Sequence, residues 1–94
     1  MRKLSEIEIT EKIKELPSWT LTGQALEKDF HFKNFSLALA FIVRIGIEAE
    51  KLNHHPEIKN IYSKVSIRLI THDVQAITNM DFLLANSIEL AYRA

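Results

Sequence analysis

The sequence predicts an α+β fold in which three helices cover one face of a four-stranded antiparallel sheet. Two observations predict it. Stretches with the apolar spacing of helices separate pairs of short stretches in which apolar and polar residues alternate. Each pair is joined by only a few residues, a length that connects antiparallel strands. The expected order is helix, strand, strand, helix, strand, strand, helix (α-β-β-α-β-β-α), a two-layer sandwich within a single domain of residues 1–94.

The first helix is expected over residues 5–16. Ser5 and Glu8 have the spacing of a capping box, in which each side chain binds the other residue's backbone N–H. Pro17 ends the helix because the residue before a proline is disfavoured in the helical conformation. One apolar face is formed by Ile9, Ile13 and Leu16.

Two short strands are expected next, over residues 19–21 and 25–32. The turn between them, residues 22–24, contains Gly23, which readily adopts a positive φ. In the second strand, Lys28 shares a face with apolar residues, which are Leu26, Phe30 and Phe32. The opposite, solvent-facing side carries Glu27, Asp29 and His31.

The longest helix begins after Asn34 or Ser36, and its apolar residues wrap most of its circumference. A helix with a single buried face needs an apolar face of only about 100°. We therefore expect the sheet to cover one side of helix 35–52 and a second copy of the chain to cover the other, in a homodimer or homotetramer. Ile42 and Ile45 are the expected contact residues. The alternative is a central helix buried by the first and third helices.

A second pair of strands is expected over residues 58–62 and 65–71, joined near residues 63–64, and the final helix follows Thr78. Thr78 and Asp81 repeat the capping-box spacing.

Composition narrows the function classes. Twelve basic and twelve acidic residues cancel, so no basic surface predicts nucleic-acid binding. Cysteine is absent, which excludes disulfides and thiolate chemistry. No segment has the length of a membrane span or the form of a signal peptide. A cytoplasmic protein without a membrane partner is the expectation.

The chemistry is expected in residues 50–72, where three of the four histidines lie. His54 and His55 are adjacent, and His72 follows at the expected end of a strand. Histidine gives and takes protons near neutral pH, so several around one pocket suit a reaction that needs an acid and a base. Glu50 precedes His54 by four residues, which places both side chains on one face if the helix persists.

A metal site is the competing interpretation. The three histidines with Glu50 or Asp81 would supply enough ligands for zinc. Adjacent histidines point in different directions, however, and no His-x-x-x-His spacing occurs, so no metal is expected. A purely structural role, as a polar turn and a strand end, is the other alternative.

The spacing of these residues resembles that of the pterin-4a-carbinolamine dehydratase family. Three residues separate Glu50 from His54-His55-Pro56, five more precede Tyr62, and His72 and Asp81 follow at intervals of nine and eight intervening residues. The resemblance extends from about residue 16 to residue 90. It includes Trp19 before the first hairpin and the Phe30–Phe35 junction between strand and helix.

The resemblance implies the dehydration of a 4a-hydroxytetrahydropterin to quinonoid dihydropterin, with no metal or organic cofactor. The substrate is produced by pterin-dependent aromatic amino-acid hydroxylases, and the reaction supports recycling of tetrahydrobiopterin. The family's three active-site histidines match His54, His55 and His72, which are the expected catalytic residues. Substrate-binding or orienting positions are expected at Glu50, Asn53, Pro56, Thr71, Asp73 and Asp81.

Three positions depart from the family pattern. Ile58 stands where many members have tryptophan, which removes an aromatic surface beside the substrate. Asn53 replaces an aspartate, and Ala76 replaces a glycine. Two alternatives remain open: a binding or dimerisation module without catalysis, because animal members also act as cofactors of a homeodomain transcription factor, or action on another pterin.

Overall fold

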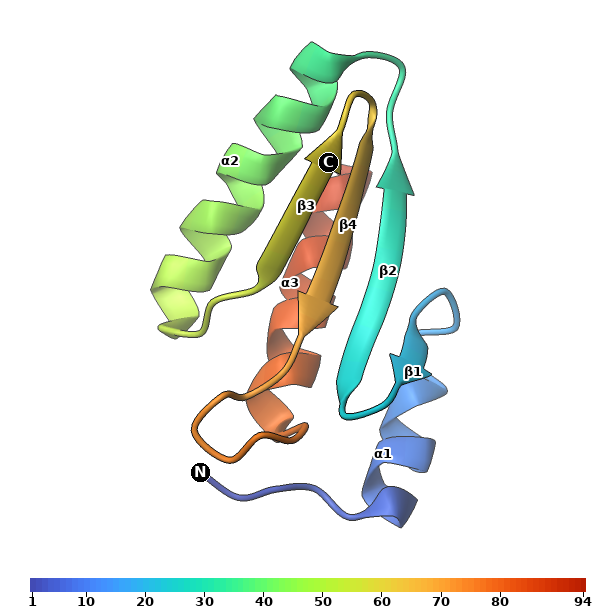
Figure 1. Ribbon diagram of the computed structural model, residues 1–94, viewed down its shortest axis with the longest axis vertical. Helices are drawn as coiled ribbons and strands as arrows, with labels where there is room; N and C mark the ends of the chain where they lie inside the picture. Colours follow the sequence, from blue (N-terminus) through green and yellow to red (C-terminus); the bar gives the residue numbers. More distant parts are fainter.

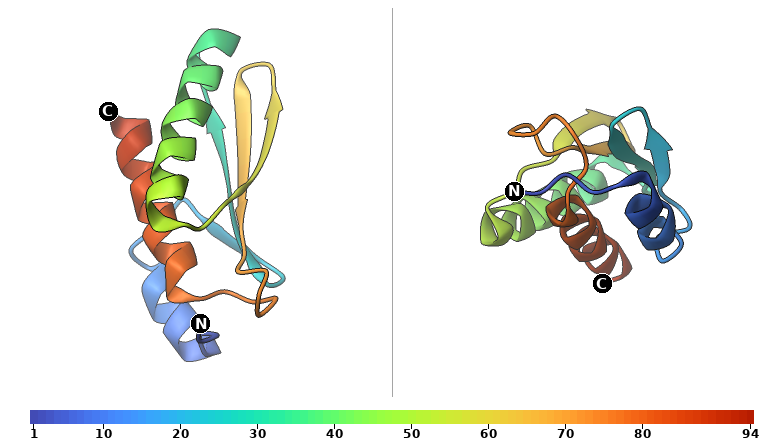
Figure 2. Two further views of the ribbon diagram at one scale, coloured as in Figure 1. Left: turned by 90° about the vertical axis from the view of Figure 1, so that its left-hand side faces the viewer. Right: turned by 90° about the horizontal axis from the view of Figure 1, so that it is seen from below.

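The computed structural model describes all residues from Met1 to Ala94 (Figure 1). Its elements are α1 (Glu6–Ile13), β1 (Thr20–Thr22), β2 (Ala25–His31), α2 (Phe35–Leu52), β3 (Glu57–Ile61), β4 (Lys64–Leu69) and α3 (Asn79–Arg93). The strands form one antiparallel sheet in the order β1-β2-β4-β3. All three helices lie on one face of this sheet (Figure 2). The predicted α+β two-layer architecture and its element order are confirmed.

The core lies between the sheet and helices α2 and α3. Strand β4 is central, and its side chains alternate between buried and half-buried along its whole length. This alternation is the pattern expected when one face of a strand meets helices and the other meets solvent. The buried side chains come from both layers and include Leu26, Phe30, Phe41, Ile45, Val65, Ile67, Leu69, Leu84 and Ile88.

Both predicted capping boxes are present, at Ser5 with Glu8 and at Thr78 with Asp81. Helix α2 begins after Asn34, whose side chain accepts a hydrogen bond from the N–H of Leu37 at 2.9 Å. These caps satisfy backbone N–H groups that have no partner inside the helix.

Helix α1 ends at Ile13, three residues before its predicted end. The next residues bond to the carbonyl three residues back, as in the 3.0 Å bond from the N–H of Leu16 to the carbonyl of Ile13. The α-helix thus gives way to a tighter turn before Pro17, and Leu16 is buried in the core as its place on the predicted apolar face requires.

Strand β4 ends at Leu69, so the prediction that it reaches residue 71 is wrong. The pairing of β4 with β3 ends at Arg68, opposite Glu57, and its pairing with β2 ends at Leu69, opposite Leu26. Instead, Thr71 pairs across the next turn with Ala76, each donating its N–H to the other's carbonyl. His72 therefore lies in a turn and not at a strand end.

The two hairpins differ from prediction by one residue. Strand β1 starts at Thr20, because Trp19 turns into the core instead. Gly23 has a positive φ of 62°, as expected. The second turn is formed by Tyr62 and Ser63, and Tyr62 adopts the left-handed conformation at φ 50°.

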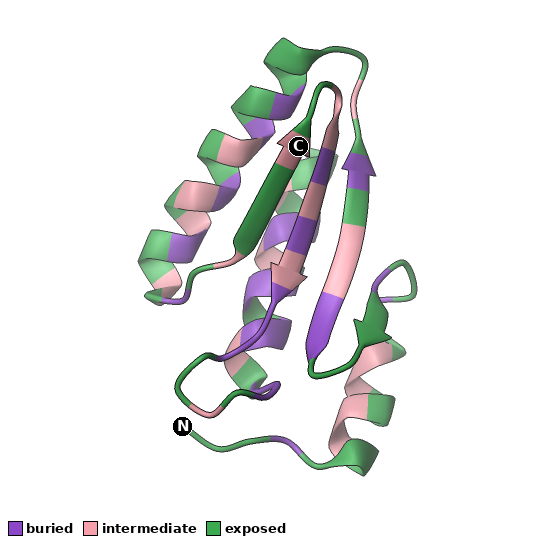
Figure 3. Ribbon diagram, in the orientation of Figure 1, coloured by how far each residue is buried: buried purple, intermediate pink, exposed green.

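One side of helix α2 is exposed along its length (Figure 3), and several of its exposed residues are apolar. Ile45 is fully buried, so the prediction that it contacts a second copy of the chain is wrong, whereas Ile42 is half-buried and part of its side chain stays accessible. The uncovered apolar side chains of this helix include Leu39, Val43 and Ile47, and Leu90 of α3 is also exposed. The alternative in which the first and third helices bury the whole helix is thus wrong. None of the helices is both long and apolar enough to cross a lipid bilayer.

Candidate functional site

The end of helix α2 sends its two adjacent histidines in different directions. Asn53 is the C-terminal cap in the left-handed conformation, at φ 51° and ψ 42°, and its N–H donates to the carbonyls of Ala49 and Glu50. Asparagine tolerates this conformation better than most residues do. The reversal turns His54 into the protein, where it is buried, and leaves His55 exposed.

The three predicted histidines lie around one pocket of about 200 Å³ at the end of the sheet where β3 begins. Its lining residues are Met1, Asn53, His54, His55, Ile70, Thr71, His72 and Asp73. A larger hollow of about 410 Å³ lies on the outer face of the sheet, between Glu27, Glu57 and Arg68, but it contains no histidine. The smaller pocket is therefore the candidate site, because its imidazoles can transfer protons near neutral pH.

Each histidine of the pocket has a carboxylate beside its Nε2 atom. His54 Nε2 lies 2.6 Å from Oδ1 of Asp81, and the Asp81 side chain is completely buried.

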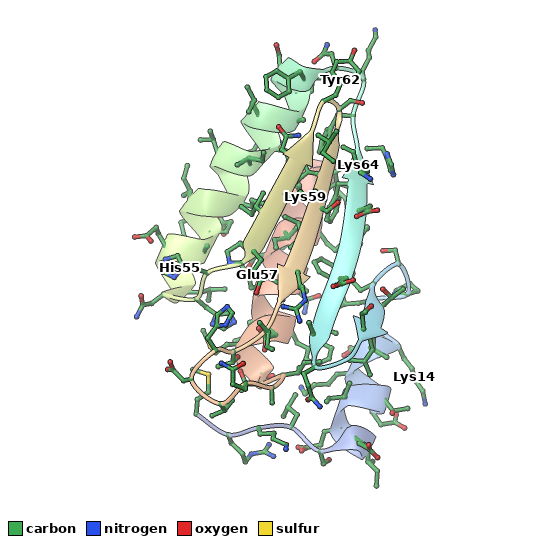
Figure 4. All side chains as sticks on the ribbon, in the orientation of Figure 1. Lys14, His55, Glu57, Lys59, Tyr62 and Lys64 are labelled. Atoms are coloured by element: carbon green, nitrogen blue, oxygen red, sulfur yellow. The ribbon has the colours of Figure 1, made fainter.

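The other two pairs are exposed. His55 Nε2 lies 2.6 Å from Oε1 of Glu50, while His72 Nε2 lies 3.5 Å from Oε2 of Glu57, beyond hydrogen-bond distance. Figure 4 shows His55 and Glu57 close to the start of β3. A carboxylate beside an imidazole orients the ring and stabilises its protonated form, so this arrangement is suited to proton transfer.

The hydrogen bond to Asp81 assigns the neutral tautomer of His54. A carboxylate only accepts, so Nε2 carries the proton and Nδ1 is the acceptor. Nδ1 has no hydrogen-bond partner within the protein. Every fully buried side-chain nitrogen and oxygen does have one, so Nδ1 is not fully buried. Nδ1 is therefore accessible to solvent, and because His54 lines the pocket, this atom can accept a proton from a molecule bound there.

Most predicted site residues do line the pocket, and the exceptions are informative. Glu50 pairs with His55 and not with His54, because the reversal at Asn53 ends the helix before the four-residue spacing can apply. Asp81 lies behind His54, away from the opening. Pro56 is half-buried between the histidines and β3 and does not line the pocket.

Sequence reasoning missed several participants. Glu57 was not expected beside His72, although its place directly after His-His-Pro was a signal. Thr78 was identified only as a helix cap, and no sequence signal indicated its contact with Thr71. Ile58, where the family often has tryptophan, is partly exposed on β3 and is not among the residues that line the histidine pocket.

No group of three or more His, Asp and Glu side chains is arranged to hold one metal ion. The three histidine–carboxylate pairs are separate, because each imidazole faces its own acid.

The fold and the site together define an α+β protein with a histidine-lined pocket at one end of its sheet. Comparison with known proteins identifies the family. The sequence model described as pterin 4 alpha carbinolamine dehydratase matches residues 2–91, and the chain belongs to this family.

The relatives cover nearly the whole chain. A protein of Prochlorococcus marinus (strain MIT 9215), provisionally named a pterin-4-alpha-carbinolamine dehydratase, is 40% identical over 90% of this chain and 88% of its own. One from Christiangramia forsetii with the same provisional name is 42% identical over 95% of this chain and 92% of its own.

Two solved structures are similar. The transcriptional coactivator/pterin dehydratase from Brucella melitensis superposes with a TM-score of 0.92 at 33% identity, covering 97% of this chain and 99% of that one. A pterin dehydratase-like RuBisCO assembly factor of the alpha-carboxysome superposes with a TM-score of 0.69 at 22% identity, over 80% of this chain and 89% of that one. The second match shows a shared fold only.

Proposed function

We propose that the protein dehydrates a 4a-hydroxytetrahydropterin to quinonoid dihydropterin and water. The observation that carries this proposal is the set of three histidine–carboxylate pairs around one pocket in a member of the dehydratase family. In the reaction the N5–H bond and the C4a–O bond break. A double bond forms between N5 and C4a, and the hydroxyl leaves as water after it gains a proton. No oxidation or reduction takes place.

The geometry supports His54 as the base that takes the N5 proton. Its Nδ1 atom is the free acceptor toward the pocket, and Asp81 at 2.6 Å stabilises the imidazolium that forms. The acid that protonates the hydroxyl is then His55 or His72, the two exposed imidazoles. Thr71 and Asp73 flank His72 at the pocket wall, where their backbone groups meet the pterin.

A reaction that supplies this substrate must place oxygen on C4a of a tetrahydropterin. Pterin-dependent aromatic amino-acid hydroxylases do so, and a reductase that acts on the quinonoid product completes recycling. We place the protein between these two steps, in the cytoplasm.

The test is a stopped-flow measurement of the decay of 4a-hydroxytetrahydropterin. We expect wild-type protein to accelerate the decay, and the His54→Ala, His55→Ala double variant not to. His31→Ala is the matched control, because His31 is exposed on β2 and does not line the pocket. Single variants of His55 and His72 identify the acid.

Two outcomes contradict the proposal. Equal acceleration by the double variant would remove the catalytic role of these histidines. Decay with wild type no faster than in buffer would favour the second candidate function, a binding module without catalysis, or action on another pterin.

We also propose that two or four copies associate through the uncovered strip of helix α2, which supports either function. Val43 is 63% exposed and Ile47 is 53% exposed, an unusual exposure for two apolar side chains one turn apart. A groove of about 300 Å³ beside them is lined in part by Arg44, Glu48 and Leu90. Because Arg44 and Glu48 lie four residues apart, an antiparallel pair of such helices sets each arginine opposite the other copy's glutamate.

Sizing chromatography tests the association. Val43→Asp is expected to give a monomer, whereas Thr10→Asp, on the exposed surface of α1, should elute as wild type. A wild-type elution volume for Val43→Asp would show that this strip is not the contact.

A further inference from the structure

Behind His54 lies a buried group of three side chains that the proposed reaction does not itself require. They are Thr71, in the turn after β4, and Thr78 and Asp81, at the start of α3. Their exposed fractions are 3%, 1% and 0%. Hydrogen bonds of 2.6–2.9 Å connect them to one another and to His54.

The number of donors and acceptors on each side chain determines which hydroxyl donates in each of these hydrogen bonds. The hydroxyl of Thr71 donates to Oδ2 of Asp81 at 2.8 Å, because a carboxylate only accepts. Thr71 has then used its only hydroxyl proton, so the 2.8 Å contact with Thr78 requires Thr78 to donate, and Sδ of Met1, 3.2 Å from the Thr78 hydroxyl, is a second and weaker acceptor of the same proton. The oxygen of Thr78 in turn accepts from the N–H of Met80 at 3.2 Å.

The two carboxylate oxygens of Asp81 have different hydrogen-bond partners. Oδ2 accepts from the hydroxyl of Thr71 at 2.8 Å and from the N–H of Thr78 at 2.9 Å. Two donors on one oxygen fix the plane of the carboxylate, which leaves Oδ1 directed at Nε2 of His54 at 2.6 Å.

We infer that Thr71 and Thr78 are positioning residues that act through Asp81 to keep the proton of neutral His54 on Nε2, so that Nδ1 faces the pocket as an acceptor. The cap of helix α3 and the tautomer of the histidine are therefore set by the same hydrogen bonds. The catalytic consequence rests on the proposed function, whereas the tautomer itself does not.

The hydroxyl of Thr71 matters because the cap alone does not fix the carboxylate, and the hydroxyl of Thr78 acts on it only through Thr71. With Thr71 replaced by valine, Oδ2 keeps only the N–H of Thr78, and the carboxylate can rotate about its χ2 bond. The hold on Nε2 then weakens, and the tautomer with the proton on Nδ1 becomes populated. That form presents a donor to the pocket and cannot take a proton there.

The test measures the tautomer directly. Long-range ¹H–¹⁵N NMR spectra distinguish the two ring nitrogens of His54, recorded at alkaline pH where imidazoles are neutral. We expect the proton on Nε2 in wild type and in Thr71→Ser, which keeps the hydroxyl, and a mixture of tautomers in Thr71→Val. Thr20→Val, on the exposed strand β1, is the matched control and should match wild type.

Stopped-flow kinetics give the second measurement. Thr71→Val should lower kcat about 10- to 100-fold with a smaller change in KM, the range observed when an outer hydrogen-bond partner of a metal-bound histidine is removed. Thr71→Ser should restore most of the rate.

Three results decide between the proposals. A proton on Nδ1 of His54 in wild type overturns the inference, even if Thr71→Val fails to fold. An unchanged tautomer and rate in folded Thr71→Val also overturns it. Wild-type protein with the Nε2 tautomer but no dehydratase activity would leave the positioning role intact and refute the proposed function.

Discussion

The buried ion pair between Lys28 and Glu89 gives the sharpest prediction about stability. Lys28 Nζ lies 2.6 Å from Oε2 of Glu89, with side-chain exposures of 13% and 11%. The same oxygen accepts the indole N–H of Trp19 at 3.0 Å. The ammonium also bonds to Ser18 at 2.7 Å and lies 4.5 Å from the centre of the Phe30 ring.

Glu89→Leu leaves a largely buried ammonium without its counter-charge and an indole N–H without an acceptor. Breaking a buried pair in this way costs about 3–5 kcal/mol. Because Ser18 remains as an acceptor, we expect the lower end, about 3 kcal/mol. At 4–8 °C per kcal/mol for a domain of this size, the melting temperature should fall by roughly 12–24 °C.

The double variant Lys28→Met, Glu89→Leu should recover most of this loss. Two apolar side chains of similar volume replace the pair, and only the N–H of Trp19 stays unsatisfied, at a cost of about 1 kcal/mol. Glu11→Leu is the control, because its ion pair with Lys14 is exposed and contributes at most about 0.5 kcal/mol.

Urea-induced unfolding measures these differences. Trp19 is the only tryptophan and reports on the cluster by fluorescence, while circular dichroism follows the backbone independently. A loss below about 1 kcal/mol for Glu89→Leu, or a double variant as unstable as the single one, would refute the reasoning.

Three further predictions concern the core, the helix end and the amino-terminal helix. Ile45→Ala should lower the free energy of unfolding by about 2–5 kcal/mol in urea, because Ile45 is fully buried and leaves a cavity. Asn53→Gly should change the melting temperature little, whereas Asn53→Ala should cost about 1 kcal/mol because alanine is strained at φ 51°. The hydrogen bond from Arg2, helped by the backbone of Ser5, lowers the pKa of Glu8 from its usual 4.5 to about 2. The stabilisation from Glu8 is thus present above pH 4.5 and is lost as the pH falls toward 2, and ¹³C NMR titration of Arg2→Ala should show the pKa of Glu8 raised.

Local patterns in the sequence were enough for the architecture. Capping boxes, strand alternation and the turn at Gly23 depend on neighbours within four residues, so they can be predicted from the sequence alone. The ordered spacing from Glu50 through His54-His55-Pro56 to His72 and Asp81 also identified the family correctly. Errors at element ends came from long-range pairing, as at Leu69, where the pairing of β4 with β2 ends one residue after its pairing with β3.

Which polar side chains pair with each other could not be predicted from local sequence patterns. Lys28 looked like an odd residue on an apolar face, and its partner Glu89 lies 61 residues further along the chain. Glu50 was assigned to His54 by helical spacing, but one left-handed residue, Asn53, redirected it to His55.

By itself the sequence determined the order of helices and strands, the caps and the histidines of the candidate site, because these depend on local backbone preferences and on residue identity. Only the tertiary structure decided which carboxylate meets which histidine and which side of α2 stays uncovered. Those choices depend on how distant segments pack. Asp81 reaches His54 across 27 residues only because α3 begins where α2 ends in space.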